Sequence, residues 1–306
     1  MSETSKPYHP GEVHFQKIMG SDERLHIIGK KILRTHVIEQ HRLFFESLPY
    51  AFISVLDDKS RPWSFMLEGA PGFIQVVEPN ILRIQHALDF PVPKLAIDTN
   101  DFFALVGLDY GTRRRNLLNG YIAARTDQYI DVQVKQSFGN CPKYIQTRHY
   151  SPSKKTTISK RSERISKFTS FTNEAQEIIS KSDTFYIASA HPQPHKRVQN
   201  QGIDINHRGG KPGFVELTNS NQLSFQNYPG NNMFYSFGNI ELNPRTGLLF
   251  INFELGDLYH LTGTSVIEKK GKEFRVIFEL DQGYVEKQAF QSSWEFLEYS
   301  PALELI

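Results

Sequence analysis

Short apolar runs separated by polar turns dominate the chain after residue 50. The runs at 51–56, 64–69, 72–77, 81–85, 102–108 and 129–134 are rich in branched and aromatic residues and are bounded by Asp, Gly, Pro and Asn, which predicts strands. Six similar runs follow between residues 183 and 280, and several alternate polar and apolar positions as a half-buried sheet does. Short strands with few helices between them predict antiparallel barrels.

The first 50 residues and a stretch near the middle depart from this pattern. Apolar residues from Ile28 to Phe44 recur at roughly helical spacing before Pro49, so this part is predicted to be helical in pieces. Residues 151–170 are polar and basic, which predicts a linker leading into a short helix at 172–181.

One motif occurs twice. The sequence GAPGF at 69–73 returns as GKPGF at 210–214, and the residues around Gly107 and Gly120 find counterparts around Gly247 and Gly263 in the same order. A spacing of about 140 residues indicates a duplicated domain, because solenoid repeats are far shorter. The length of 306 residues also fits two domains.

Composition excludes several classes of protein. The 35 Lys and Arg nearly balance the 33 Asp and Glu, so a net charge of +2 gives no overall field for nucleic acid or anionic lipid. Neither a leader pattern nor an apolar stretch of about 20 residues is present, so we expect a cytoplasmic protein without nucleic-acid or membrane partners. Cys141 is the single cysteine and the histidines lack ligand spacing, so no metal site is expected.

Residues 206–214, NHRGGKPGF, have the composition of an anion-binding loop. Its glycines permit positive φ angles that turn successive N–H groups toward one point, Arg208 offers a planar fork of donors, and Lys211 adds a mobile charge. These donors and charges are suited to binding a phosphate group. A tight β-turn with solvated basic residues is the alternative.

A second candidate segment spans residues 227–239. Its four Asn side chains, a hydroxyl and its aromatic rings can bind the edge and the face of a flat heterocycle. Ordinary loop chemistry explains the same composition equally well.

Two segments of the first copy are further candidates for a functional site. Arg113 to Arg115 repel one another unless an anion or carboxylates meet them, and the alternatives are a solvated turn or, more weakly, an RNA-binding patch. Cys141 lies near Lys143, but no base is identifiable beside it, so we expect a packing role for this thiol.

Together, TRRRNLLNG, NCPKYIQ, NHRGGKPGFV and YPGNNMFYSFGNIELNP, with GLLFINF followed by LTG, resemble the pyridoxamine 5'-phosphate oxidase-like FMN-binding split barrels, and among them the tandem two-barrel subgroup. The resemblance covers about residues 8 to 300. It implies a mainly β protein with peripheral helices, in which two tandem split β-barrels form an intramolecular pseudo-dimer. The implied domains are a degenerate copy at 1–150, the basic linker at 151–170 and a phosphate-binding copy at 171–306.

The resemblance also implies FMN in the cleft between the barrels, with its phosphate held by the second copy and the first copy acting as partner. The implied cofactor-binding residues are Asn206, His207, Arg208, Lys211, Asn231, Ser236, Asn239, Arg114, Arg115, Asn119 and Lys143. We expect one flavin per chain, because the first copy has Ser60-Arg61-Pro62-Trp63 where the second has its basic glycine run.

The expected function is that of an FMN-binding oxidoreductase acting on a small molecule, with a separate reductase as electron donor, because the chain shows no dinucleotide-binding fingerprint of its own. The sequence identifies no catalytic residue and no particular substrate. A haem-binding or haem-degrading split barrel and a non-catalytic flavin carrier or sensor are the alternatives.

Overall fold

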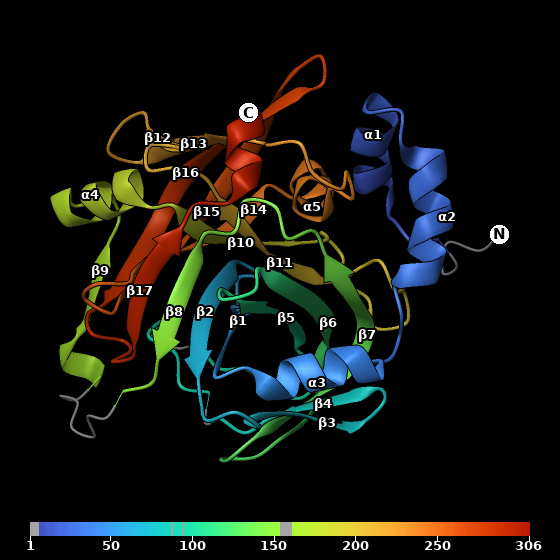
Figure 1. Cartoon of the computed structure of the whole chain (residues 1–306), viewed down its shortest axis with the longest axis horizontal. Helices are drawn as coiled ribbons and strands as arrows, with labels where there is room; N and C mark the ends of the chain where they lie inside the picture. Colours follow the sequence, from blue (N-terminus) through green and yellow to red (C-terminus); the bar gives the residue numbers. More distant parts are fainter. Residues whose placement is uncertain (1–5, 87, 94, 154–160) are drawn as a thin grey trace.

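The computed structural model describes residues 6–86, 88–93, 95–153 and 161–306. Two antiparallel sheets form the body of the protein, and the helices lie around them (Figure 1). The helices are α1 (Pro10–Ile18), α2 (Asp22–Ile32), α3 (Glu39–Ser47), α4 (Asn173–Lys181) and α5 (Tyr235–Leu242). The mainly β fold with peripheral helices is therefore confirmed.

The first sheet has the order β2-β1-β5-β6-β7-β4-β3, and the second has β11-β10-β14-β15-β16-β13-β12. These orders are identical once the strands of each sheet are numbered from their own start, as a duplication requires. The first sheet comprises β1 (Tyr50–Leu56), β2 (Pro62–Glu68), β3 (Ile74–Glu78), β4 (Ile81–Ile84), β5 (Phe102–Asp109), β6 (Arg114–Arg125) and β7 (Ile130–Asn140). The second comprises β10 (Thr184–Ala190), β11 (Ile203–Gly209), β12 (Val215–Leu217), β13 (Gln222–Gln226), β14 (Arg245–Asn252), β15 (Asp257–Lys270) and β16 (Glu273–Glu286).

The two copies also share irregularities of the backbone. Gly72 and Gly213, in the repeated turn, have φ angles of 91° and 90°, which only glycine adopts without strain. Gly120 and Gly263 lie at equivalent bulges, where an added Cβ would come within 2.1 Å and 2.0 Å of a carbonyl oxygen on the neighbouring strand. Both pairs of glycines are thus fixed by backbone geometry.

One predicted correspondence is wrong. Phe103 pairs with Gly120, and Thr246 pairs with Gly263, so the counterpart of Gly247 is Ala104 and not Gly107. The two glycines serve different contacts: Gly107 leaves room for Phe45 and Leu48, whereas Gly247 lets the backbone approach Pro62 of the other sheet.

The sheets pack on each other reciprocally. Strand β2 contacts β10, β14 and β15, and its counterpart β11 contacts β1, β5 and β6. The registers make Phe52 and Tyr186 equivalent positions, and these two rings stack on each other with centroids 3.8 Å apart. Contact between equivalent residues is the mark of a two-fold arrangement, so the halves form a pseudo-dimer within one chain.

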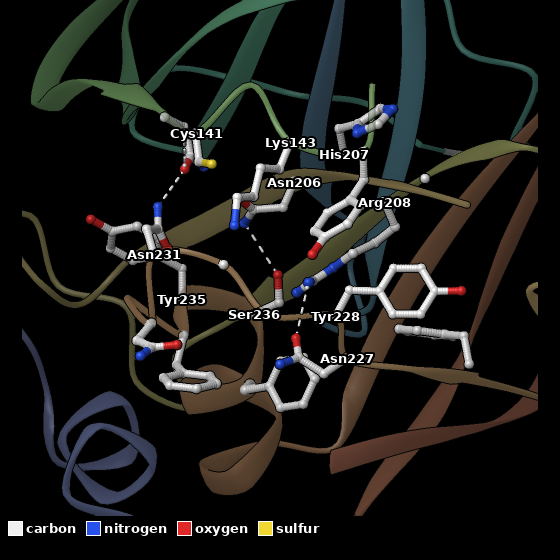
Figure 2. Close-up of a pocket in the computed structure, with 18 of the residues that line it drawn as sticks. Cys141, Lys143, Asn206, His207, Arg208, Asn227, Tyr228, Asn231, Tyr235 and Ser236 are labelled. Carbon is white, nitrogen blue, oxygen red and sulfur yellow. Dashed lines mark hydrogen bonds between the residues drawn. The ribbon is translucent and has the colours of Figure 1, made fainter. Parts of the chain in front are cut away.

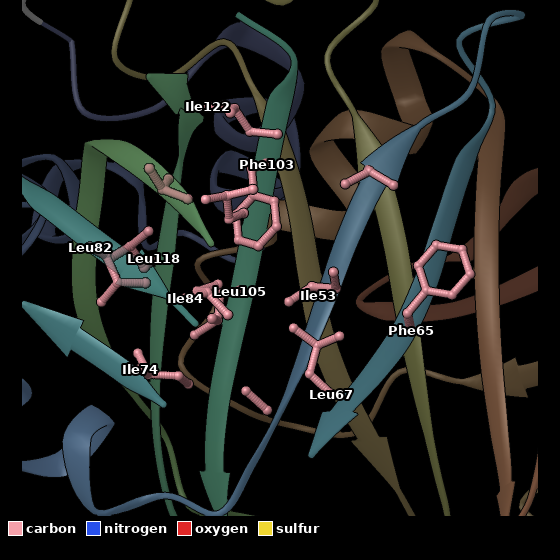
Figure 3. Close-up of a cluster of buried hydrophobic side chains, with 14 of the residues drawn as sticks. Ile53, Phe65, Leu67, Ile74, Leu82, Ile84, Phe103, Leu105, Leu118 and Ile122 are labelled. Atoms are coloured by element: carbon pink, nitrogen blue, oxygen red, sulfur yellow. The ribbon is translucent and has the colours of Figure 1, made fainter. Parts of the chain in front are cut away.

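Buried apolar side chains form three clusters. One consists mainly of side chains of the first sheet (Figure 3), and another mainly of side chains of the second. The third lies largely between the sheets and includes Phe52, Tyr110, Tyr186 and Leu249. The large shared cluster, which buries whole aromatic rings, ties the halves into one body.

Several segments cross the predicted domain boundaries, which themselves stay a prediction. Helix α1 packs on α5 of the second half, and β8 (Thr147–Ser151) pairs with β17 (Ser293–Glu298). Part of the predicted linker forms a strand, β9 (Ile165–Phe168), which pairs with β16. Phe168 at its end is buried in the core of the second half, which holds this strand in place. Linker residues 154–160 lie outside the described residues. No described helix is long and apolar enough to cross a membrane.

Candidate functional site

A pocket of about 820 Å³, counted together with the open solvent at its mouth, lies where the two halves meet. The first half contributes the start of β6 and the segment after β7, and the second contributes β11, β13 and the segment that leads into α5 (Figure 2). Of the predicted cofactor residues, seven line this pocket: Arg115, Lys143, Asn206, His207, Arg208, Asn231 and Ser236. Residues from distant parts of the sequence therefore converge here as expected.

Two arginines from opposite halves dominate the electrostatics. Arg115 donates to the backbone oxygen of His207 at 3.3 Å, and Arg208 donates to Asn227 Oδ1 at 3.3 Å. Among the described residues, neither guanidinium lies within 4.0 Å of a carboxylate, and the buried Nε of each has no hydrogen-bond partner. The pocket thus holds two nearby positive charges, and none of its described lining residues supplies a counter-charge.

Burial and, to a smaller extent, the nearby charge of Arg115 together lower the pKa of Arg208 to about 10. Burial likewise lowers the pKa of Arg115 to about 10. Both groups still carry their charge at neutral pH. His207 is neutral, since burial and then the three surrounding arginines, Arg115 among them, hold its pKa well below the usual value.

Polar groups surround the two guanidinium groups. Asn206 donates to Ser236 Oγ at 3.1 Å, which joins β11 to the first turn of α5. Asn231 donates to Asn140 Oδ1 at 2.6 Å and so links the two halves. Lys143 is exposed at the pocket and faces the same space as Arg208 and Ser236 (Figure 2). Hydroxyl, amide and cationic donors are therefore all within one pocket.

Backbone strain gathers at this site. Tyr144, Asn232 and Phe234 line the pocket with φ angles of 65°, 61° and 60°, a region that costs residues other than glycine on the order of 1–3 kcal/mol. Tyr144 is held there by Ser300, whose Oγ accepts from its backbone N–H at 3.1 Å. Strain kept in place by surrounding contacts is typical of functional sites.

Two tyrosines from opposite halves meet at the pocket. The rings of Tyr144 and Tyr228 have centroids 5.2 Å apart, and the Tyr144 hydroxyl donates to the Pro229 carbonyl at 2.7 Å. Tyr228, Phe225 and Gln226 were not among the predicted site residues. The sequence signal for Tyr228 was its place in the Asn-rich segment, whereas nothing in the sequence distinguished Phe225 and Gln226 from other strand residues.

The remaining four predicted residues lie elsewhere. Lys211 is exposed and does not line the pocket. Arg114 donates to the Gln40 carbonyl at 2.8 Å and covers the Phe44 ring. Asn119 and Asn239 are buried and donate to opposite oxygens of the Asp204 carboxylate, at 2.5 and 2.8 Å. Adjacent residues of a strand point to opposite faces, so Arg114 and Arg115 separate.

The predicted glycine-rich anion loop takes another form. Asn206 to Arg208 lie on strand β11, and within 206–214 only Gly213 has a positive φ angle. Gly209 is required for a different reason, because an added Cβ would lie 2.0 Å from the Tyr144 carbonyl oxygen. The pocket therefore presents side chains rather than a ring of backbone N–H groups.

The comparisons with known proteins gave matches only among solved structures, since no family model and no curated protein matches the chain. HupZ from Group A Streptococcus is 13% identical with a TM-score of 0.27, covering 42% of this chain and 97% of its own. A Clostridium acetobutylicum protein related to general stress protein 26, of the pyridoxinephosphate oxidase family, is 11% identical with a TM-score of 0.29, covering 40% and 92%. HutZ, the haem storage protein from Vibrio cholerae, is 11% identical with a TM-score of 0.28, covering 38% and 94%. The solved structures thus include a protein described as belonging to the family that the sequence motifs resemble.

Proposed function

We propose that the pocket between the two halves binds FMN through its phosphate and that the protein is a flavin-dependent oxidoreductase. One observation carries this proposal: Arg115 and Arg208 reach the same pocket from opposite halves, and none of the described residues that line it has a carboxylate. Two uncompensated guanidinium groups repel each other, and a phosphate dianion would neutralise both.

The other groups of the pocket suit the rest of the cofactor. Ser236, Asn206 and Lys143 add donors for phosphate oxygens, and the amides of Asn231 and Asn232 can bind the polar edge of a heterocycle. Phe225, Phe237 and Tyr228 supply apolar and aromatic walls. When bound, flavin supplies hydride or single-electron transfer, while the chain binds it, orients it and limits its contact with water.

The reaction partners are part of this proposal. We propose a small-molecule substrate that reaches the flavin through the open side of the pocket, and a separate reductase as electron donor. Two features of the sequence support a separate reductase. The chain has no dinucleotide-binding fingerprint, and its single cysteine excludes a cysteine-ligated iron-sulfur relay within the chain.

A ligand pair tests the proposal. FMN and riboflavin differ only by the phosphate, so Arg208→Leu and Arg115→Leu should each weaken FMN binding by about 10- to 100-fold and leave riboflavin binding nearly unchanged. Arg114→Leu is the matched control, because Arg114 lies outside the pocket, and it should change neither affinity. Equal binding of FMN and riboflavin by the unmodified protein would contradict the proposal, as would a haem absorption band in the purified protein.

A further inference from the structure

The two-fold arrangement creates a second cleft at the position equivalent to the first. The repeated turn places Leu67 where the second copy has Arg208, since each lies two residues before the first glycine of the turn. The bulge glycines place Leu258 where the first copy has Arg115. Both cations of the first pocket are therefore replaced by leucine in this cleft, which measures about 840 Å³ together with the open solvent at its mouth.

Half of the described residues that line the second cleft are apolar or aromatic, and the other half are polar or charged. Phe65, Leu67, Phe90, Leu258 and Phe290 line it, and the rings of Phe65 and Phe90 have centroids 4.4 Å apart. Aromatic walls of this kind favour flat apolar molecules.

The charges of the cleft disfavour an anion. Glu286 is 2% exposed and occupies the position equivalent to Asn140, and both of its carboxylate oxygens accept from Arg161 at 2.7 Å. Glu68 and Asp89 also line the cleft, so three carboxylates face the two arginines, Arg161 and Arg164. Arg161 and Arg164 both lie within ion-pair distance of Glu286, so they are already compensated and offer little to a phosphate, whereas an uncharged ligand needs no counter-charge.

His260 supplies an unused hydrogen-bond acceptor. Its side chain is 1% exposed, and Nδ1 lies 2.8 Å from the Ser64 carbonyl oxygen, so Nδ1 carries the proton and donates. Nε2 is then a bare acceptor, and no described residue donates to it. Burial lowers the pKa of His260 to about 4, so the ring stays neutral at pH 7.

We propose that this second cleft binds an uncharged, flat apolar molecule that carries one N–H or O–H donor, and that His260 Nε2 accepts from that donor. A buried acceptor without a partner is costly to the folded protein, and a ligand donor removes that cost. The site does not depend on flavin, because it shares no lining residue with the first pocket.

Indole and benzofuran test this proposal, since both are flat, uncharged bicyclic molecules and only indole has a donor. Titrations followed by ligand-observed NMR should show indole binding about three- to tenfold more tightly than benzofuran. His260→Phe should remove this preference, and Ala289→Trp, which fills the cleft from its wall, should abolish binding of both. Arg208→Leu, in the other pocket, should leave the affinities for indole and benzofuran unchanged.

The proposal is overturned if indole and benzofuran bind the unmodified protein equally, if neither binds up to its solubility limit, or if the preference survives in His260→Phe. Because the comparison of the two ligands uses the unmodified protein, it remains decisive even if a variant fails to fold.

Discussion

Replacing Arg208 with leucine should stabilise the flavin-free protein, although it weakens FMN binding. The pKa of Arg208 falls from 12.5 to about 10 through burial and repulsion by Arg115, which at 1.36 kcal/mol per unit corresponds to a cost on the order of 3 kcal/mol. Because the folded-state pKa is the lower one, this cost applies at every pH below about 10.

Two favourable contacts offset part of that cost. Arg208 lies over the Phe237 ring at 5.3 Å, a contact worth about 0.5–1 kcal/mol, and its bond to Asn227 contributes about 0.5–1.5 kcal/mol. The net gain for Arg208→Leu in the flavin-free protein is then about 1 kcal/mol, or a rise in Tm of about 2 °C. Leucine occupies the equivalent position, Leu67, so the local backbone accommodates it.

The matched control is Arg148→Leu, because Arg148 is a buried arginine that has its carboxylate. Its Nη2 donates to both oxygens of Asp183 at 2.6 Å, and the two side chains are 7% and 9% exposed. Removing Arg148 leaves Asp183 buried and unpaired, which should cost about 3–5 kcal/mol.

Calorimetry with and without FMN measures both variants. Without FMN, Arg208→Leu should melt slightly above the unmodified protein and Arg148→Leu well below it. With saturating FMN, Arg208→Leu should instead melt below the unmodified protein, because the unmodified protein binds FMN more tightly and is stabilised more by it. A marked loss of flavin-free stability in Arg208→Leu would show that the guanidinium has a protein partner and would refute the reasoning.

Three further predictions concern other parts of the protein. Burial raises the pKa of Asp204 from 3.8 to about 6, so the free energy of unfolding should fall as the pH rises from 4 to 7 and this carboxyl loses its proton. In denaturant titrations, Asp204→Asn should reduce that fall by about 2–3 kcal/mol. Parallel pH profiles of the variant and the unmodified protein would contradict this prediction. Gly120→Ala and Gly263→Ala should each destabilise by about 1–3 kcal/mol because of their close backbone contacts, whereas Gly202→Ala, with open space around it, should be nearly neutral in the same measurement. Cys141 lines the first pocket, and we expect its thiol to have a packing role, so Cys141→Ala should keep FMN affinity within about threefold; loss of turnover with flavin still bound would disprove that role.

The sequence predicted most strands because their apolar runs stand out from polar turns. The start of strand β6 was not predicted as a strand: Arg114, Arg115 and Asn116 are polar, and this run was interpreted as a possible turn. Polar residues are tolerated there because successive side chains serve separate tertiary contacts, Arg114 with α3 and Arg115 in the pocket. Such contacts leave no hydrophobic periodicity to detect.

The site was predicted in its segments but not in all its residues. Asn119 and Asn239 share a segment with true pocket residues, yet both bind the buried Asp204 carboxylate. Asn239 lies away from the pocket because its segment continues as helix α5, whose residues 235–240 are all buried, and there its amide meets the Asp204 carboxylate. The pairing of Arg208 with Arg115 in one pocket depends on how the two halves pack, which composition and spacing do not encode.

A crystal structure of the protein grown with FMN tests the central claim most directly. The account predicts one flavin per chain, with its phosphate between the guanidinium groups of Arg115 and Arg208. A phosphate bound elsewhere, or a flavin in the cleft lined by Leu67 and Leu258, would contradict it.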